Sequence, residues 1–198
     1  MIQTILFDLS EVLIAGLFGI EKPLARQLGI SEHQVIEAFG GARLHDLCRG
    51  EISEDRYLEQ IIAERDWKIS PDAIKRIIRA NFHRPVRDMD ALVARLATRY
   101  ELVLLSDHAA EWIAYIRSIH SVLDYFPRQF FSYELTQTKR EPAMFQIVLD
   151  AIQRNPSQCL FIDDTEANVA TARALGIDGI VFTSVEQLRK TLIAQGVW

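Results

Sequence analysis

Short runs of apolar residues alternate along the chain with longer stretches in which apolar residues recur at helical spacing. The runs predicted as strands lie at 4–7, 102–105, 129–131, 159–162 and 179–182. Helical spacing predicts helices at 89–99, 112–119, 142–152, 167–175 and 185–194. Gly176 stands where a glycine commonly caps the end of a helix. Strands that alternate with helices are typical of parallel sheets joined by crossover helices, so the pattern predicts an α/β fold with helices on both faces of the sheet.

The stretch from residue 14 to 87 differs, because its apolar residues show helical periodicity alone. Ser31 followed by Gln34 resembles a capping box, and Ser70 stands in the same way before a predicted helix at 71–80. We therefore predict an all-helical insertion between the first strand and the rest of the sheet.

This insertion divides the chain into two predicted parts. Residues 1–13 and 88–198 would form the core, and residues 14–87 would form a small cap. The apolar segment 14–20, where the cap begins, is expected to pack or to act as a hinge rather than to bind ligand. The helices of the cap also offer apolar surface for a homodimer, which the sequence leaves open.

The composition is that of an ordinary globular protein. Of 198 residues, 49% are hydrophobic and 25% are charged, and the formal net charge is -5. A mild acidic excess argues against a nucleic-acid partner, because such a surface needs a clustered positive field. The basic residues between positions 76 and 87 are interpreted as a solvated helix face.

Cysteine usage and hydrophobic patterning bear on the compartment. Cys48 and Cys159 are too few for a disulfide framework and have no metal-ligand spacing. The sequence shows neither a secretory signal pattern nor about 18 consecutive apolar residues. These features predict a cytoplasmic protein without a membrane partner.

Residues able to do chemistry follow three of the predicted strands. Asp8 follows the first, Ser106 the second, and the acidic pair at 163–164 the fourth. Lys139 comes between the second and the fourth of these strands in the sequence. Since ligands of parallel sheets bind beyond the carboxyl ends of the strands, these side chains are expected to share one site.

Together these groups supply what displacement at a phosphate ester requires. A carboxylate can attack phosphorus and form an acyl-phosphate. A magnesium ion held by carboxylates would offset the clustered negative charge. A serine hydroxyl and a lysine ammonium can hold the non-bridging oxygens, where charge must be stabilised. The residues therefore favour phosphoester hydrolysis with Mg²⁺ as the cofactor.

The order and spacing of these residues resemble the four motifs of the haloacid dehalogenase-like (HAD) hydrolase superfamily. The segments that carry the resemblance are 7–13 (FDLSEVL), 105–108 (LSDH), Lys139 with Pro142 and Phe145, and 162–164 (IDD) followed by Asn168, Ala172 and Gly176. The insertion is similar to the small helical cap of many members, and its segment 49–53 is typical of that cap. The resemblance implies a Rossmann-like core, and it is greatest to sugar-phosphate phosphatases and to the phosphatase domains attached to epoxide hydrolases.

The same resemblance implies roles for the site residues. Asp8 would be the nucleophile, and Ser106 and Lys139 would bind the phosphoryl oxygens. Magnesium would be held by four oxygen donors: the Asp8 carboxylate, the backbone carbonyl of Ser10, the Asp164 carboxylate and, directly or through water, Asp163.

The chain departs from the family at Ser10, a catalytic position where phosphatases usually carry a second aspartate. That aspartate protonates the leaving alcohol, and a serine hydroxyl is too weakly acidic to do so at neutral pH. General acid–base catalysis is worth about 100- to 10,000-fold. We therefore expect a slow phosphatase or one that acts on good leaving groups, with Glu11 and His108 as candidates to supply the proton.

The substrate is expected to be a small phosphorylated metabolite whose remainder meets the cap. Besides Ser106 and Lys139, the candidate substrate contacts are Asp107, where relatives often have Asn, and the cap residues Arg43, His45 and Arg49.

Two other functions stay open. One is a catalytically impaired protein with a binding or regulatory role. The other is a metal-independent dehalogenase that uses the same aspartate to attack carbon. The adjacent acidic pair at 163–164 indicates a metal, and therefore favours phosphate.

Overall fold

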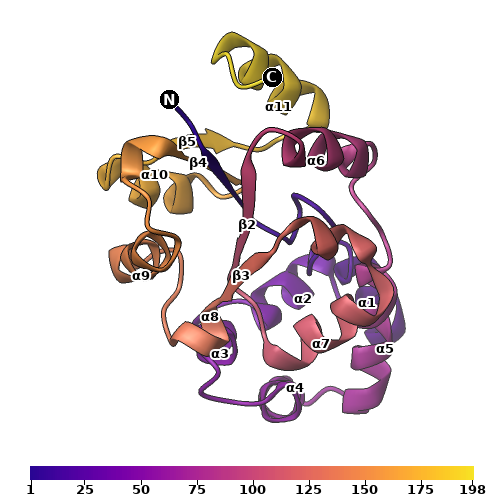
Figure 1. The fold of residues 1–198 in the computed structure, drawn as a ribbon. Helices are drawn as coiled ribbons and strands as arrows, with labels where there is room; N and C mark the ends of the chain where they lie inside the picture. The colour runs from indigo at the N-terminus through magenta and orange to yellow at the C-terminus, as the bar shows by residue number, and fades with distance from the viewer.

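A five-stranded parallel sheet forms the centre of the molecule (Figure 1). The computed structural model describes residues 1–198, and the strand order is β3-β2-β1-β4-β5. The strands are β1 (Thr4–Phe7), β2 (Glu101–Ser106), β3 (Arg128–Phe131), β4 (Cys159–Asp163) and β5 (Asp178–Val181). Phe7 at the end of β1 pairs with Leu104 of β2 and with Ile162 of β4. The predicted Rossmann-like α/β fold is confirmed, and the register brings the carboxyl ends of β1, β2 and β4 to the same edge.

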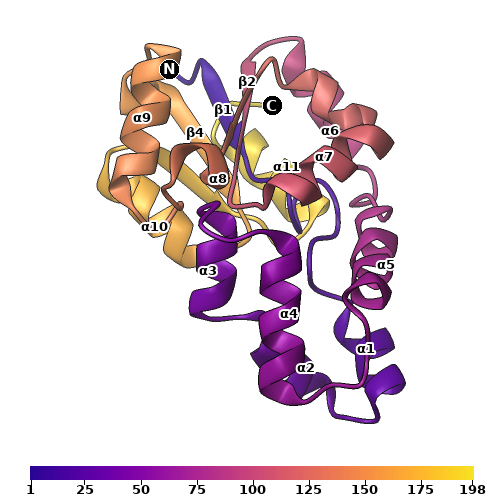
Figure 2. The same cartoon turned by 90° about the horizontal axis from the view of Figure 1, so that it is seen from below.

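Helices cover both faces of the sheet, as Figure 2 shows for α9 and α10 on one side and α6 and α7 on the other. Leu6 and Phe161 point into one apolar cluster, whereas Phe7 and Ile162 point into the other. The first cluster includes residues of α9 (Pro142–Ile152) and α10 (Glu166–Ala174). The second includes residues of α6 (Met89–Ala97), α7 (Ala110–Ile119) and α11 (Val185–Ala194). Burial on both faces explains why the strands read as continuous apolar runs.

The observed elements differ from the predicted ones by at most two residues at each end. Helix α7 begins at Ala110, two residues before Trp112, because the pattern registers only the first large apolar side chain. Gly176 follows the C-cap residue of α10 with a φ of 86°, as a C-terminal glycine should. Three short helices are too brief to show a periodicity: η1 (Ser121–Tyr125), α8 (Ser132–Leu135) and η2 (Pro156–Gln158).

The insertion after β1 contains five helices and no strand. They are α1 (Glu21–Leu28), α2 (Glu32–Phe39), α3 (Ala42–Cys48), α4 (Glu54–Arg65) and α5 (Pro71–Phe82). Ser31 forms the predicted capping box with Gln34 at the start of α2. Ser70 caps α5 only through its own side chain, because Ala73 has no side chain that could return the hydrogen bond. The predicted helical character of this region is therefore confirmed, while its independence as a domain stays a prediction.

The two segments that connect the insertion to the core run side by side. Val86 donates its backbone N–H to the carbonyl of Leu13 over 2.9 Å, and Ala15 donates to the carbonyl of Arg84 over 2.8 Å. An isolated antiparallel bridge joins the residues between them. The chain therefore enters and leaves the insertion at adjacent points.

A buried carboxylate of the insertion contacts the core. Glu54 of α4 is 2% exposed; its carboxylate pairs with Arg79 of α5 at 2.5 Å and accepts a hydrogen bond from Trp112 Nε1 at 2.7 Å. The rings of Tyr57 and Trp112 meet edge to face, with their centroids 6.3 Å apart. Because Trp112 belongs to α7, these contacts hold the insertion against the core.

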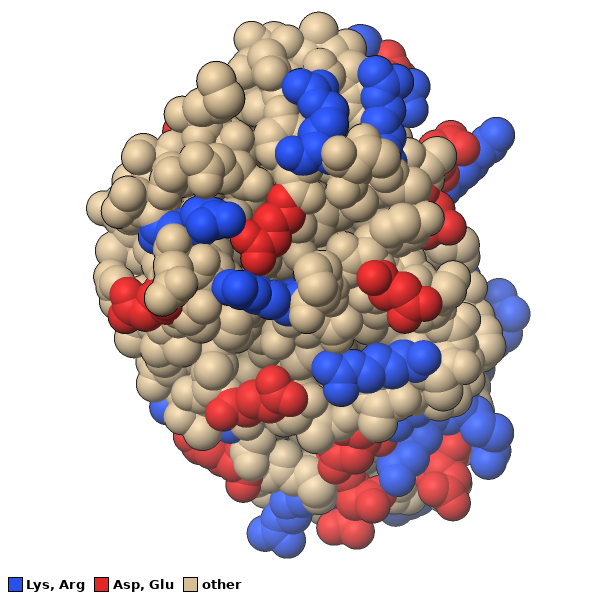
Figure 3. Space-filling view, viewed as in Figure 1, with Lys and Arg blue, Asp and Glu red and all other residues tan.

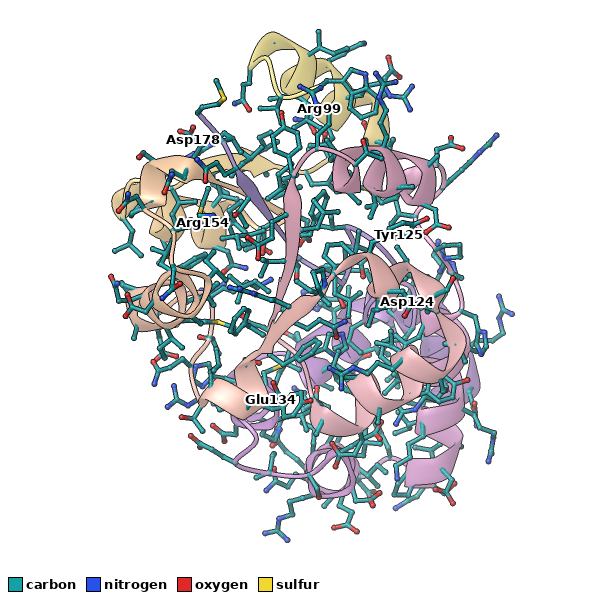
Figure 4. All side chains as sticks on the ribbon, viewed as in Figure 1. Arg99, Asp124, Tyr125, Glu134, Arg154 and Asp178 are labelled. Carbon is teal, nitrogen blue, oxygen red and sulfur yellow. The ribbon has the colours of Figure 1, made fainter.

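The amino ends of the strands are joined by a separate ionic network. Arg154, labelled beside the sheet in Figure 4, donates hydrogen bonds of 3.2 Å to the Thr4 hydroxyl and to Glu101. Arg128 at the start of β3 pairs with the same Glu101 at 3.4 Å. The charged groups at this edge are thus engaged with one another, and the candidate chemistry lies at the opposite edge.

Charged side chains of both signs are interspersed over the face of the molecule seen in Figure 3. This distribution agrees with the small net charge of -5. None of the helices has the length and apolar character needed to cross a membrane.

Candidate active site

Asp8 lies directly beyond the end of β1 and is almost fully buried. Its backbone N–H donates to the carbonyl of Ile162 over 2.9 Å, which continues the pairing with β4. Its Oδ1 atom accepts a hydrogen bond from Ser106 Oγ at 3.0 Å and lies 2.6 Å from Lys139 Nζ. Neither contact uses Oδ2, so this oxygen is available for chemistry.

Lys139 is the buried cation of the site. Its Nζ atom lies 2.6 Å from Asp8 and 2.7 Å from Asp163 Oδ2. Burial alone would lower the pKa of this ammonium, but Asp163, Asp8 and Asp107 together raise it above its ordinary value. Lys139 therefore stays charged and joins the ends of β1 and β4.

The two neighbouring aspartates at the end of β4 have different environments. Asp163 is fully buried and accepts hydrogen bonds from Thr165 N at 2.8 Å and from Asn168 Nδ2 at 3.1 and 3.2 Å, in addition to Lys139. Asp164 is only partly buried and lines the cavity in front of the sheet. Asp163 is thus held by the protein, while Asp164 has room for another ligand.

Negative charge exceeds positive charge in this cluster. One carboxylate oxygen from each of Asp8, Asp163 and Asp164 lies within 4.8 Å of the other two. Burial raises the pKa of the Asp8 carboxyl from 3.8 to about 7; Lys139 opposes this rise, and Asp163 adds to it. Burial and Asp163 also raise the pKa of Asp164. A set of oxygen donors that lacks positive charge fits Mg²⁺, a hard cation that prefers carboxylates.

Asp107, a predicted substrate contact, receives the backbone N–H of Lys139 at its two oxygens, at 3.0 and 3.2 Å. Burial raises the pKa of its carboxyl, and Lys139 opposes the rise. Asp107 lines the cavity, but its hydrogen bonds are made to the backbone of Lys139, so it positions the loop that carries this lysine.

Ser10, the position at which the sequence departs from the family pattern, contacts His108. Ser10 Oγ lies 3.0 Å from His108 Nε2, and the buried Nδ1 atom of His108 has no hydrogen-bond partner. Burial lowers the pKa of His108 to about 3, and Lys139 and Arg79 contribute to this shift. The imidazole is therefore neutral at physiological pH, which makes it a poor general acid.

Glu11 stabilises the loop at residues 16–18, a role that the sequence alone does not indicate. Its backbone adopts a φ of 61°, and its Oε1 atom accepts hydrogen bonds from the backbone N–H groups of Gly16 at 2.7 Å and Phe18 at 3.3 Å. The side chain thus holds the loop that begins the insertion. Engagement in two backbone hydrogen bonds disfavours Glu11 as the proton donor.

The three basic residues predicted to face the substrate are not all in the cavity. His45 is exposed and lines it. Arg43 pairs with Glu64 of α4 and is absent from the lining, because it lies on the side of α3 that faces α4. Arg49 pairs with Glu51 at 3.0 Å and with Glu141 at 2.8 Å. Only His45 is thus placed as a candidate contact.

The site opens into a cavity of about 690 Å³ between the carboxyl edge of the sheet and the insertion. Asp8, Lys139 and Asp164 lie on its core side. The cap side is mostly apolar and includes Leu17, Phe18, Val35, Ile36, Phe39 and Leu44. The segment 14–20, predicted to pack or hinge, therefore also contributes to the cavity wall.

The chain resembles one family of hydrolases. A family model described as haloacid dehalogenase-like hydrolase matches residues 2–176. A protein of Arabidopsis thaliana named flavin mononucleotide hydrolase 1 is 22% identical over 194 residues, which cover 98% of this chain and 77% of that protein.

Solved structures share the fold. A HAD family enzyme of Bacteroides thetaiotaomicron in complex with magnesium and inorganic phosphate has a TM-score of 0.77 and 23% identity, over 93% of this chain and 96% of that one. L-2-haloacid dehalogenase from Xanthobacter autotrophicus, with chloropropionic acid covalently bound, has a TM-score of 0.67 and 16% identity, over 100% of this chain and 85% of that one. The same architecture thus carries a phosphate-binding and a dehalogenating relative.

Proposed function

Because the chain belongs to the haloacid dehalogenase-like hydrolase family, we propose that it hydrolyses the phosphate monoester of a small metabolite. The observation that carries the proposal is the cluster at the carboxyl edge of the sheet. There a buried lysine and a serine hydroxyl converge on the Asp8 carboxylate, beside a second pair of carboxylates. This combination suits attack by a carboxylate on a phosphoryl group whose oxygens are held by a lysine and a serine hydroxyl.

Magnesium is the proposed cofactor. Asp8, Asp164 and the backbone carbonyl of Ser10 would hold it, with Asp163 acting directly or through water. When bound, Mg²⁺ would neutralise charge on the phosphoryl oxygens and on the clustered carboxylates.

Asp8 would act as the nucleophile through Oδ2, the oxygen without a protein hydrogen bond. A bond forms between this oxygen and phosphorus, while the bond from phosphorus to the alcohol oxygen breaks. Lys139 and Ser106 orient the carboxylate through Oδ1 and lie where they can bind the phosphoryl oxygens. Water then attacks phosphorus, the bond to Asp8 breaks, and inorganic phosphate leaves.

The leaving alcohol must obtain a proton without a carboxylic acid at position 10. Ser10 is too weak an acid, and His108 is neutral with a pKa of about 3. We therefore propose slow turnover or a substrate with a good leaving group. Ser10→Asp should raise turnover on alkyl phosphates and change turnover of p-nitrophenyl phosphate less. An equal effect on both classes would contradict this explanation.

Two alternatives have distinct signatures. A dehalogenase would release halide in EDTA, and the dehalogenase relative supports that reading only through its fold. A binding or regulatory protein would bind phosphate and magnesium but release no phosphate from any ester. The three convergent carboxylates favour a metal site, and with it the phosphatase.

The deciding experiment is phosphate release from a panel of phosphorylated metabolites and p-nitrophenyl phosphate, with magnesium or with EDTA. Flavin mononucleotide belongs in the panel because one relative is named for its hydrolysis. We expect magnesium-dependent release that Asp8→Asn abolishes. Release that persists in Asp8→Asn would reject Asp8 as the nucleophile.

A cytoplasmic location and a homodimer are two further proposals. The cysteines Cys48 and Cys159 are free and buried, which suits the reducing environment of the cytoplasm. A homodimer can be tested by light scattering of the purified chain.

A further inference from the structure

We infer that the alcohol part of the substrate carries an apolar, ring-sized group that binds between Phe18 and Ile36 on the cap side of the cavity. This inference rests on the proposed phosphatase function and adds the class of substrate. A cavity of about 690 Å³ is sized for a ligand much larger than a two- or three-carbon phosphate.

Two of the exposed apolar side chains of the protein flank this cavity. Phe18 is 65% exposed and Ile36 is 51% exposed, and both belong to its lining. Leu17 and Leu44 lie beside them and are only partly buried. Apolar side chains left in water around a concave site favour an apolar ligand, because its binding would remove their surface from water.

The cap side offers little to a second charged group. Its charged or imidazole side chains in the lining are Glu21 and His45. Glu21 accepts the backbone N–H of Gly19 at 2.7 Å, and Arg43 is engaged with Glu64 outside the cavity. A bisphosphate or a dicarboxylate would therefore find no lysine or arginine on the cap side, because Arg140 of the lining belongs to the core side.

The loop that carries Phe18 is fixed from two sides. Glu11 accepts the N–H groups of Gly16 and Phe18, while Asn81 Nδ2 donates to the carbonyls of Gly16 at 2.7 Å and Phe18 at 2.9 Å. Gly19 has a φ of 112°, and a Cβ atom there would lie 2.8 Å from Arg84 Nη1. The exposed Phe18 side chain is thus presented by an ordered backbone, as a specificity residue should be.

The test compares two esters whose alcohols are equally poor leaving groups: 3-phenylpropyl phosphate and 3-hydroxypropyl phosphate. With magnesium, we expect kcat/KM to favour the phenyl ester by about 10- to 100-fold, the effect of burying one phenyl group. A ratio near one would overturn the inference and leave the phosphatase proposal intact.

Substitutions in the cavity wall test whether Phe18 and Ile36 cause the preference for the phenyl ester. Phe18→Ser and Ile36→Ser should each reduce the ratio of the two kcat/KM values by about 3- to 10-fold. Ile193→Ser is the matched control, because Ile193 is 56% exposed on α11, outside the cavity lining. A ratio that stays unchanged in both cavity variants would also overturn the inference.

Binding separates this inference from the proposed reaction. Titration calorimetry with Asp8→Asn and magnesium should show tighter binding of the phenyl ester. If neither ester is hydrolysed but the phenyl ester still binds preferentially, the apolar subsite stands, and phosphate release from p-nitrophenyl phosphate and the metabolite panel decides the phosphatase proposal separately. Equal binding, or no binding of either ester, rejects the subsite.

Discussion

Replacing Asp8 by asparagine should make the metal-free protein gain stability relative to the wild type as the pH rises, although it removes the proposed nucleophile. Burial raises the pKa of the Asp8 carboxyl from 3.8 to about 7. The folded state therefore holds this proton more tightly than the unfolded state. Its contribution to stability is fully present below pH 3.8 and is lost as the pH rises through 7. The asparagine amide would be neutral throughout, so the variant would escape this loss.

The magnitude follows from the two pKa values. A rise from 3.8 to about 7 corresponds to roughly 4 kcal/mol when fully developed, of which roughly 2.5 kcal/mol falls between pH 5 and pH 8. The free energy of unfolding of Asp8→Asn, relative to that of the wild type, should increase by this amount over the same range. The comparison between two pH values cancels any pH-independent cost of weakening the contact with Lys139.

Urea unfolding in EDTA at pH 5 and pH 8 measures the effect. Asp163→Asn is the contrasting variant: Asp163 accepts hydrogen bonds from Lys139, Thr165 and Asn168, so its replacement should destabilise the fold. Magnesium at 100 times its Kd should add about 2.7 kcal/mol to the wild type. A difference between Asp8→Asn and wild type that is the same at both pH values would refute the reasoning.

Two other substitutions probe the buried charges. Lys139→Met should destabilise the metal-free protein by roughly 3–5 kcal/mol, because it leaves Asp8 and Asp163 without their cation; a loss below about 1 kcal/mol in urea unfolding would contradict the ion pair. Glu54→Ala should cost a similar roughly 3–5 kcal/mol by stranding Arg79 and Trp112 Nε1, whereas Glu59→Ala on the exposed side of α4 should cost less than about 0.5 kcal/mol. Equal losses in the two glutamate variants would argue against the buried contact.

The sheet and the central residues of the site could be predicted from the sequence for a common reason. Strands buried on both faces leave apolar runs, and their carboxyl ends meet at one edge. Asp8, Ser106 and the pair at 163–164 could thus be grouped from their positions after these runs. Lys139 follows no strand, so its place in this group depended mainly on the resemblance to known motifs, because a lysine in a loop carries no local signal of burial.

The contacts that shape the cavity could not be predicted in this way. Asn81 reaches Gly16 across 65 positions of sequence, and Glu11 holds Phe18 through backbone groups that leave no pattern in the chain. The pairing of Arg43 with Glu64 likewise depends on how α3 and α4 pack. The tertiary structure decides which of several polar side chains pair with one another, and the sequence pattern does not show it.

The adjacent crossing points at Leu13 and Val86 have an evolutionary consequence. Since the backbone leaves and rejoins the core where its two arms are hydrogen-bonded, an insertion of another length or helix number can be exchanged there without altering the strand register. The exchange is constrained at one place, because any replacement must still cover Trp112 on α7. Such an exchange would replace the cavity wall that faces the proposed active site and leave the residues at the carboxyl edge of the sheet unchanged.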